Sequence, residues 1–198
     1  MFGSGTKAIK QYVDILTSRG IAWGMIGPRE AGRIWQRHVL NSVSIADLIG
    51  DGERVADIGS GAGLPGIPLA ILRPDLRITL VEPLLRRWSF LELAVEELGI
   101  GARIDVVRAR AEDLTGADQP RYTTVTSRAL APLAKVVLWC RPLMAPGGQI
   151  VAIKGRSAED EVARDRGDLA RMGVAATVVP CSTPGSAELT YAVVVRRR

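Results

Sequence analysis

The stretch Val55–Ala70 is VADIGSGAGLPGIPLA, and it packs four glycines into eight positions between two apolar runs. The preceding run is typical of a short strand, and the following run is typical of a helix. A loop between a parallel strand and its helix lies at the carboxyl edge of the sheet, where open α/β folds bind ligands. Glycines there permit positive φ angles and let a ligand touch the main chain. The stretch therefore predicts a small-molecule site beside a helix amino terminus.

From residue 54 onward, short β-rich runs alternate with longer helical runs. The β-rich runs are 54–58, 77–82, 103–109, 122–127 and 148–154, and the helical runs are 64–73, 84–98, 132–144 and 157–172. Such alternation is typical of a parallel sheet with crossover helices. Two further β-rich runs, 176–180 and 188–196, flank the segment CSTPGSA, whose Pro and Gly predict a terminal hairpin.

The first fifty residues have a different pattern. Apolar residues at helical spacing occupy 6–18, and Pro28 opens a second helical run that continues to residue 40. We expect residues 1–50 to form an N-terminal helical cap packed on a main domain of residues 51–198, the two making one structural unit.

Two registers of the glycine loop predict different ligands. Gly61, Gly63 and Gly66 spell G-x-G-x-x-G, the dinucleotide fingerprint, whereas Gly59, Gly61 and Gly63 spell G-x-G-x-G, with Asp57 two residues before the first glycine. Either fingerprint alone is weak evidence, so the choice depends on the residues around it.

The surrounding residues favour a methyl donor over a dinucleotide. Pro65 lacks the amide that a pyrophosphate would use. Asp57 supplies a negative charge, which suits a ligand that carries a positive ammonium and sulfonium better than a ligand that carries phosphates. Glu82 ends the second strand, where a carboxylate can accept hydrogen bonds from ribose hydroxyls. The acids of Ala109–Asp113 follow the third strand, where one could meet an adenine amine.

With the terminal hairpin, these features predict an α/β fold of the class I S-adenosylmethionine-dependent methyltransferase type. This fold is Rossmann-like, with a seven-stranded sheet and an antiparallel terminal strand. The expected cofactor is S-adenosylmethionine and the product is S-adenosylhomocysteine. An NAD-dependent oxidoreductase remains a distant alternative.

The amino-acid composition limits the classes of molecule that this chain is expected to bind. The chain has 198 residues, a net charge of +5 and a pI near 9.7, which favour an acidic partner such as nucleic acid. One histidine and two widely separated cysteines, Cys140 and Cys181, offer no metal-ligand spacing, so we expect no metal and two core thiols. The sequence has no long apolar run and no signal-peptide pattern, and we expect a soluble, cytoplasmic protein that does not enter a membrane.

The segment after the fourth strand constrains the methyl acceptor. An enzyme that methylates a base amine would carry an Asp- or Asn-Pro-Pro-aromatic tetrad, and this chain has Thr126-Ser-Arg-Ala-Leu-Ala-Pro132 instead. Guanine N7 carries an in-plane lone pair and no proton, so its methylation needs alignment and no general base. The scarcity of candidate bases is compatible with that chemistry.

Four segments together carry a family resemblance: Arg37–Ser42 (RHVLNS), Asp57–Gly66 (DIGSGAGLPG), Ser127–Ala129 (SRA) and Ala152–Gly155 (AIKG). With them the chain closely resembles the ribosomal small-subunit methyltransferase G family, also called glucose-inhibited division protein B. The resemblance covers essentially the whole chain. It implies S-adenosylmethionine-dependent methylation of guanine N7 in the 530 loop of bacterial 16S rRNA, a modification whose loss is associated with low-level streptomycin resistance.

The resemblance also implies site residues. It places cofactor contacts at Gly59, Leu64, Ala111, Glu112 and Arg128. The match departs from the family at three positions. Ser60 and Ala62 replace a frequent threonine and proline, and Asn41 stands where many relatives have aspartate.

A second set of residues is expected to face the RNA. Arg128 is a candidate for placing the substrate, because it can hold either the cofactor or guanine O6. Lys154 can neutralise a phosphate or form a structural ion pair. The expected RNA-binding residues are Arg37, His38, Asn41, Lys154 and Arg156. The expected partner is 16S rRNA or the 30S subunit, and the alternative is a non-catalytic RNA-binding protein that keeps the fold.

Overall fold

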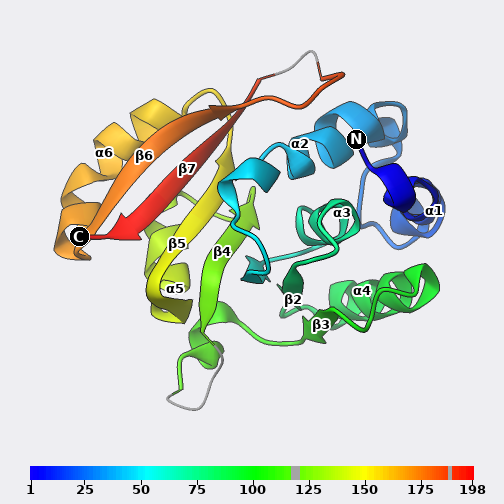
Figure 1. The fold of residues 1–198 in the computed structure, drawn as a ribbon, viewed down its shortest axis with the longest axis horizontal. Coiled ribbons are helices and arrows are strands. Elements are labelled where there is room, and N and C mark those ends of the chain that lie inside the picture. Colours follow the sequence, from blue (N-terminus) through cyan, green and yellow to red (C-terminus); the bar gives the residue numbers. More distant parts are fainter. Residues whose placement is uncertain (117–120, 187–188) are drawn as a thin grey trace.

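The computed structural model describes residues 1–116, 121–186 and 189–198. A seven-stranded sheet in the order β3-β2-β1-β4-β5-β7-β6 forms its centre (Figure 1). Its strands are β1 (Arg54–Ile58), β2 (Arg77–Val81), β3 (Ile104–Val107), β4 (Tyr122–Arg128), β5 (Met144–Lys154), β6 (Val174–Cys181) and β7 (Thr190–Arg197). Strands β1 to β5 run parallel to one another, and β7 runs antiparallel between β5 and β6. The predicted sheet and its antiparallel terminal strand are confirmed.

The crossover helices cover both faces of the sheet. They are α3 (Gly66–Leu72), α4 (Leu85–Leu98), α5 (Leu133–Cys140) and α6 (Ala158–Arg171). α4 ends at Gly99, whose φ of +64° forms a left-handed cap that few other residues adopt. Each predicted strand and helix from residue 54 is present within a few residues of its expected bounds. The predicted last strand began at residue 188, which lies outside the described residues.

The first fifty residues are helical, as predicted, but their helices are irregular. α1 (Thr6–Ile15) runs on into a π turn at Leu16–Gly20. A 3-10 segment at Pro28–Arg33 leads into a π turn at Trp35–Leu40 and the short α2 (Asn41–Val43), and a 3-10 turn follows at Ala46–Leu48. Figure 1 shows this cap beside α3 and α4, where α1 packs.

The cap and the sheet share one apolar core. Ile9, Tyr12 and Leu16 of the cap are buried in the same cluster as Leu80 of β2 and Phe90 of α4. A second cluster fills the opposite face of the sheet, under α5 and α6. Cys140 and Cys181 are free and buried, which confirms them as core thiols. Among the described residues, no helix is long and apolar enough to cross a membrane.

Candidate functional site

The glycine loop between β1 and α3 is held from two sides. The amides of Gly59 and Ser60 donate to the carbonyl of Val81 at the end of β2, at 2.9 and 3.1 Å. From the cap, the buried Tyr12 hydroxyl donates to the carbonyl of Ala62 at 2.7 Å. Burial raises the pKa of Tyr12 far above its ordinary value, so the hydroxyl remains a donor. The loop conformation therefore depends on both the sheet and the cap.

The glycines of this loop serve different purposes. Gly59, Gly61 and Gly63 have φ angles of +71°, +57° and +96°. A Cβ on Gly63 would lie 2.5 Å from Ile67 Cδ1 and 3.2 Å from Leu91 Cδ2, so this glycine permits close packing of the loop on its own helix. The expected contact between Gly63 and a ligand stays a prediction. Gly59 and Gly61 lie beside the cavities described below.

Replacement of Gly63 by alanine is expected to destabilise the fold by about 2–4 kcal/mol, because a positive φ and a steric overlap with Ile67 combine. The matched control is Gly52→Ala. Gly52 also has a positive φ, +66°, but nothing lies within 4 Å of its Cβ position. The control is expected to cost about 1 kcal/mol. Chemical denaturation of both variants checks this, and equal losses would contradict the packing role of Gly63.

Asp57 lies beneath the loop and not in a cavity. Its side chain is fully buried, and its Oδ2 accepts a hydrogen bond from the Gly66 amide at 3.0 Å. Its Oδ1 is a buried oxygen without a hydrogen-bond partner within the described residues. Asp57 therefore lines neither of the main cavities and anchors the first turn of α3. Its expected interaction with the positive charge of the ligand stays a prediction.

Stability is expected to depend on the ionisation of Asp57. Burial raises the pKa of Asp57 from 3.8 to about 7. The folded state then holds a proton that the unfolded state has lost, so stability falls as the pH rises from about 4 to about 7. Three units of pKa correspond to about 4 kcal/mol. We expect Asp57→Asn to lose this component of the pH dependence in denaturation measured from pH 4 to pH 8. Parallel pH curves for wild type and variant would contradict the shift.

A first cavity, which we call the inner cavity, opens at the carboxyl ends of β1, β2 and β3. It has a volume of about 370 Å³ and an apolar wall that includes Val81 and Leu130. The predicted cofactor residues Gly59, Glu82, Ala111, Glu112 and Arg128 all line it. Residues separated by up to 69 positions in the chain thus meet at one edge of the sheet.

Glu82 is the buried acid of the inner cavity. Its Oε2 accepts from the Gly61 amide and its Oε1 accepts from the Leu84 amide, both at 3.0 Å. The Arg87 guanidinium lies 4.0 Å from Oε2. Each carboxylate oxygen keeps a further lone pair, so Glu82 can fix the loop and also accept hydrogen bonds from a ligand. Glu112 lies at the same cavity but is exposed.

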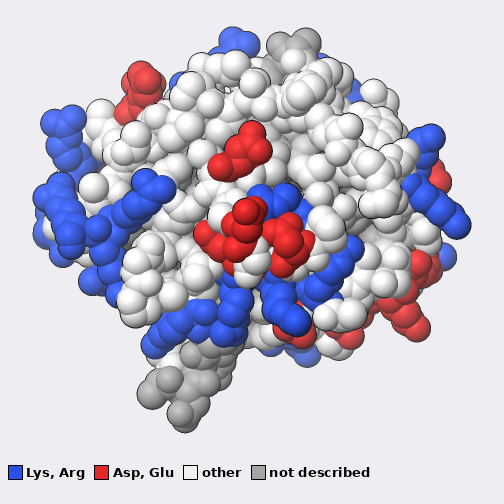
Figure 2. Space-filling model, viewed as in Figure 1, with Lys and Arg blue, Asp and Glu red and all other residues white. Residues whose placement is uncertain are grey.

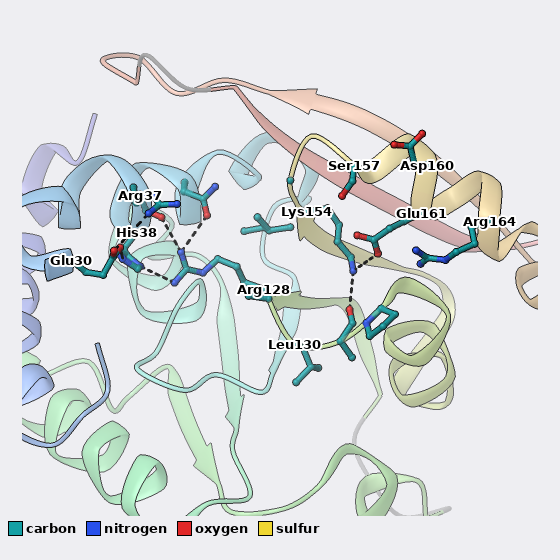
Figure 3. A pocket seen from close by; sticks show the side chains of 16 residues that line it. Glu30, Arg37, His38, Arg128, Leu130, Lys154, Ser157, Asp160, Glu161 and Arg164 are labelled. Carbon is teal, nitrogen blue, oxygen red and sulfur yellow. Dashed lines mark hydrogen bonds and ion pairs between the residues drawn. The ribbon is translucent and has the colours of Figure 1, made fainter. Parts of the chain in front are cut away.

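The second, outer cavity has a volume of about 880 Å³ and lies between the cap, the segment after β4 and α6 (Figure 3). Arg128, Ala129 and Leu130 line both the inner and the outer cavity. Ala129 has a φ of +49°, which is uncommon for a residue with a side chain and turns the chain sharply at this point. The segment 128–130 is therefore the wall that the two cavities share.

Arg128 reaches from this wall to the cap. Its Nη1 donates to the carbonyl of Arg37 at 3.1 Å and to Asn41 Oδ1 at 3.3 Å, and its Nη2 lies 3.2 Å from His38 Nδ1. Arg128, with Gly61, Leu64 and His38, also lines a hollow of about 360 Å³ between the glycine loop and the cap. Arg128 thus joins the sheet edge, the glycine loop and the cap.

Lys154 occupies the opposite wall of the outer cavity. Its Nζ donates to Glu161 Oε2 at 2.8 Å and to the carbonyl of Ala131 at 2.9 Å (Figure 3). Its side chain is only 10% exposed. The contact with Glu161 is the structural ion pair that the sequence left open for Lys154, and it ties β5 to α6. A contact between Lys154 and an RNA phosphate stays a prediction. Arg156, two residues later, is exposed.

Basic side chains form several groups on the face seen in Figure 2. They gather at the end of the molecule that carries the C-terminus and along the lower edge, around a small acidic group. Arg37 and Arg156 both line a smaller hollow between the cap and the last strands. Within the described ranges, no cluster of His, Cys, Asp and Glu could hold a metal ion.

Comparison with known proteins bears on this arrangement. The family model described as rRNA small subunit methyltransferase G matches residues 6–190. The chain belongs to this family. The family's ribosomal RNA small subunit methyltransferase G from Mycolicibacterium gilvum is 50% identical over 175 residues, which cover 88% of this chain and 76% of the relative. The protein of the same name from Mycolicibacterium smegmatis is 47% identical, over 100% of this chain and 84% of the relative.

A solved structure agrees on the fold. A precorrin-6y C5,15-methyltransferase from Geobacter metallireducens superposes with a TM-score of 0.56 at 17% identity, covering 88% of this chain and 91% of that chain. The match shows the architecture of this family member and nothing about its substrate.

Sequence reasoning missed several residues that shape the site of this family member. The glycine loop is held by Tyr12. His38 is held by Glu30, and Lys154 is held by Glu161. Their partners lie between 7 and 50 positions away in the chain. The one usable signal was Glu161, seven residues after Lys154 at the start of a helix, where it could turn back toward the strand end.

Proposed function

We propose that this protein transfers the methyl group of S-adenosylmethionine to N7 of a guanine in the 530 loop of 16S rRNA, within the small ribosomal subunit. Family membership supports the substrate class. The observation that carries the mechanism is the wall at 128–130, because it separates an inner cavity suited to a nucleoside from an outer cavity open to a larger partner. Such an enzyme would work in the cytoplasm.

The inner cavity fits the adenosine end of the cofactor. Glu82 offers lone pairs to two ribose hydroxyls, while Val81 and Leu130 provide apolar walls for a planar base. Glu112, which lines the same cavity, would accept a hydrogen bond from the exocyclic amine. When bound, S-adenosylmethionine supplies a methyl group on a positively charged sulfur. The hollow beside Gly61, Leu64 and Arg128 is the space available for its amino-acid end.

The outer cavity is large enough for a purine taken out of its stack. The reaction at guanine N7 removes no proton, so the residues need only orient the base and exclude water. Arg128 uses three of its five N–H donors on the cap. The two that remain can hold guanine O6 beside N7 or the cofactor carboxylate. The exposed Arg37 and Arg156 can contact phosphates at the rim.

A binding and transfer assay tests the enzyme class. The protein is titrated with S-adenosylhomocysteine and with NADH, and labelled S-adenosylmethionine is offered with 30S subunits or naked 16S rRNA from a strain that lacks this protein. We expect S-adenosylhomocysteine binding, no NADH binding and label in the rRNA. Cofactor binding with no label in either substrate would contradict the proposal and favour a non-catalytic RNA-binding protein.

A further inference from the structure

His38 lies in a chain of contacts that the sequence did not indicate. Its Nε2 is 2.9 Å from Glu30 Oε2, and its Nδ1 is 3.2 Å from Arg128 Nη2 (Figure 3). An arginine side chain has donors only and cannot accept a hydrogen bond. The Nδ1 must therefore be the acceptor, and the ring proton must lie on Nε2, from which it donates to Glu30. These contacts define one tautomer of a neutral imidazole.

Two hydrogen bonds likewise fix the orientation of the Asn41 side-chain amide. Its Nδ2 donates to Thr190 Oγ1 at 2.9 Å, and its Oδ1 accepts from Arg128 Nη1 at 3.3 Å. The bond to Thr190 at the start of β7 turns the amide so that its oxygen faces the guanidinium. The carbonyl of Arg37 is the third acceptor. Three acceptors from the stretch 37–41 thus surround Arg128, and two of them are fixed from behind by other elements.

We infer that His38 and Asn41 are positioning residues for Arg128 and not RNA contacts: Glu30 and Thr190 orient them, and they hold the guanidinium at the wall between the two cavities. The inference rests on the proposed function, because the position of Arg128 matters only if that wall is the place of methyl transfer. It replaces the sequence-based expectation that His38 and Asn41 bind RNA. It also predicts an acid-sensitive contact, because a protonated His38 would turn a donor and a positive charge toward Arg128.

The charges around His38 set the pH at which this contact is lost. Glu30, Arg37 and Arg128 are the charged groups that face the ring, and Arg33 acts on Glu30. Burial and the two arginines lower the pKa of His38, and Glu30 opposes them. His38 is therefore neutral at pH 7 and accepts from Arg128 there.

The first test observes the ring without any turnover. His38 is the one histidine of the chain, so untagged protein labelled with nitrogen-15 histidine gives the signals of one imidazole. We expect the Nε2–H tautomer at pH 7, a pKa below 6.5, and a rise of that pKa in Arg128→Ala. A proton on Nδ1 at pH 7, or a pKa that Arg128→Ala leaves unchanged, would overturn the inference.

The second test links the contact to transfer. Asparagine at 38 keeps an acceptor near the Nδ1 position and does not titrate, whereas phenylalanine keeps the ring shape without an acceptor. We expect His38→Asn to retain activity within about fivefold at pH 8 and to lose the acid limb of the wild-type kcat profile. His38→Phe is expected to lose about 50-fold in kcat at pH 8 with unchanged RNA affinity. Full kcat in His38→Phe, or an unchanged acid limb in His38→Asn, would contradict the inference, whereas an inactive wild type would contradict the proposed function alone.

Discussion

Replacement of Arg128 by alanine is expected to lower kcat/KM for methyl transfer by about 100-fold or more, which corresponds to about 2.7 kcal/mol of transition-state stabilisation. Arg128 lines both cavities and is bound to Arg37, His38 and Asn41 of the cap, so its loss removes a wall residue and a link at once. Arg128→Lys is the matched control. Lysine keeps the positive charge but lacks the planar guanidinium with its paired donors. We expect Arg128→Lys to have a kcat/KM less than tenfold above that of Arg128→Ala.

The affinity of Arg128→Ala for S-adenosylhomocysteine distinguishes whether Arg128 binds the cofactor or the guanine. A loss of affinity in Arg128→Ala would assign its free donors to the cofactor, and unchanged affinity with lost turnover would assign them to the guanine. Thermal denaturation of the same samples controls for folding. Activity within a few-fold of wild type in Arg128→Ala would contradict the importance of the 128–130 wall.

Glu82→Gln is expected to weaken S-adenosylhomocysteine binding by about 30- to 100-fold. The carboxylate accepts from the amides of Gly61 and Leu84, and glutamine has one acceptor oxygen in place of two. One backbone amide would lose its partner, and a ribose hydroxyl would meet a neutral group, at a cost of about 1–3 kcal/mol for each unsatisfied group. Isothermal titration measures the affinity.

Glu112→Gln is the matched control, because Glu112 lines the same cavity but is exposed. We expect it to change the affinity by no more than about threefold, since a hydrogen bond in contact with water contributes little net free energy. Equal effects of the two substitutions would show that burial of Glu82 and its bonds to the loop do not matter for binding.

The sheet was predictable because local patterns specify it. The run at 54–58, the glycines after it and the helical spacing beyond are all contained in one short stretch, and the later strands were predicted from their own short β-rich runs. The acid Glu82 was predictable for the same reason, because the carboxyl ends of neighbouring parallel strands meet at one edge.

The contacts across the site were not predictable from local patterns. Arg128 meets residues 87 to 91 positions away, on a cap whose helices mix 3-10, π and α turns. Whether Lys154 forms an ion pair depends on the position of α6, which brings Glu161 within 2.8 Å of its Nζ. The side chain is largely buried in this pair. The full burial of Asp57 under the loop and the packing of Gly63 on Ile67 also depend on tertiary structure, which local sequence does not reveal.

The most direct test of the central claim is identification of the methylated nucleoside. The protein is incubated with methyl-labelled S-adenosylmethionine and with 30S subunits or 16S rRNA from a strain that lacks this protein. The rRNA is then digested, and the nucleoside that carries the label is identified and mapped. We expect 7-methylguanosine in the 530 loop. Label at another atom or in another region of the rRNA would contradict the account, although the protein would remain a methyltransferase.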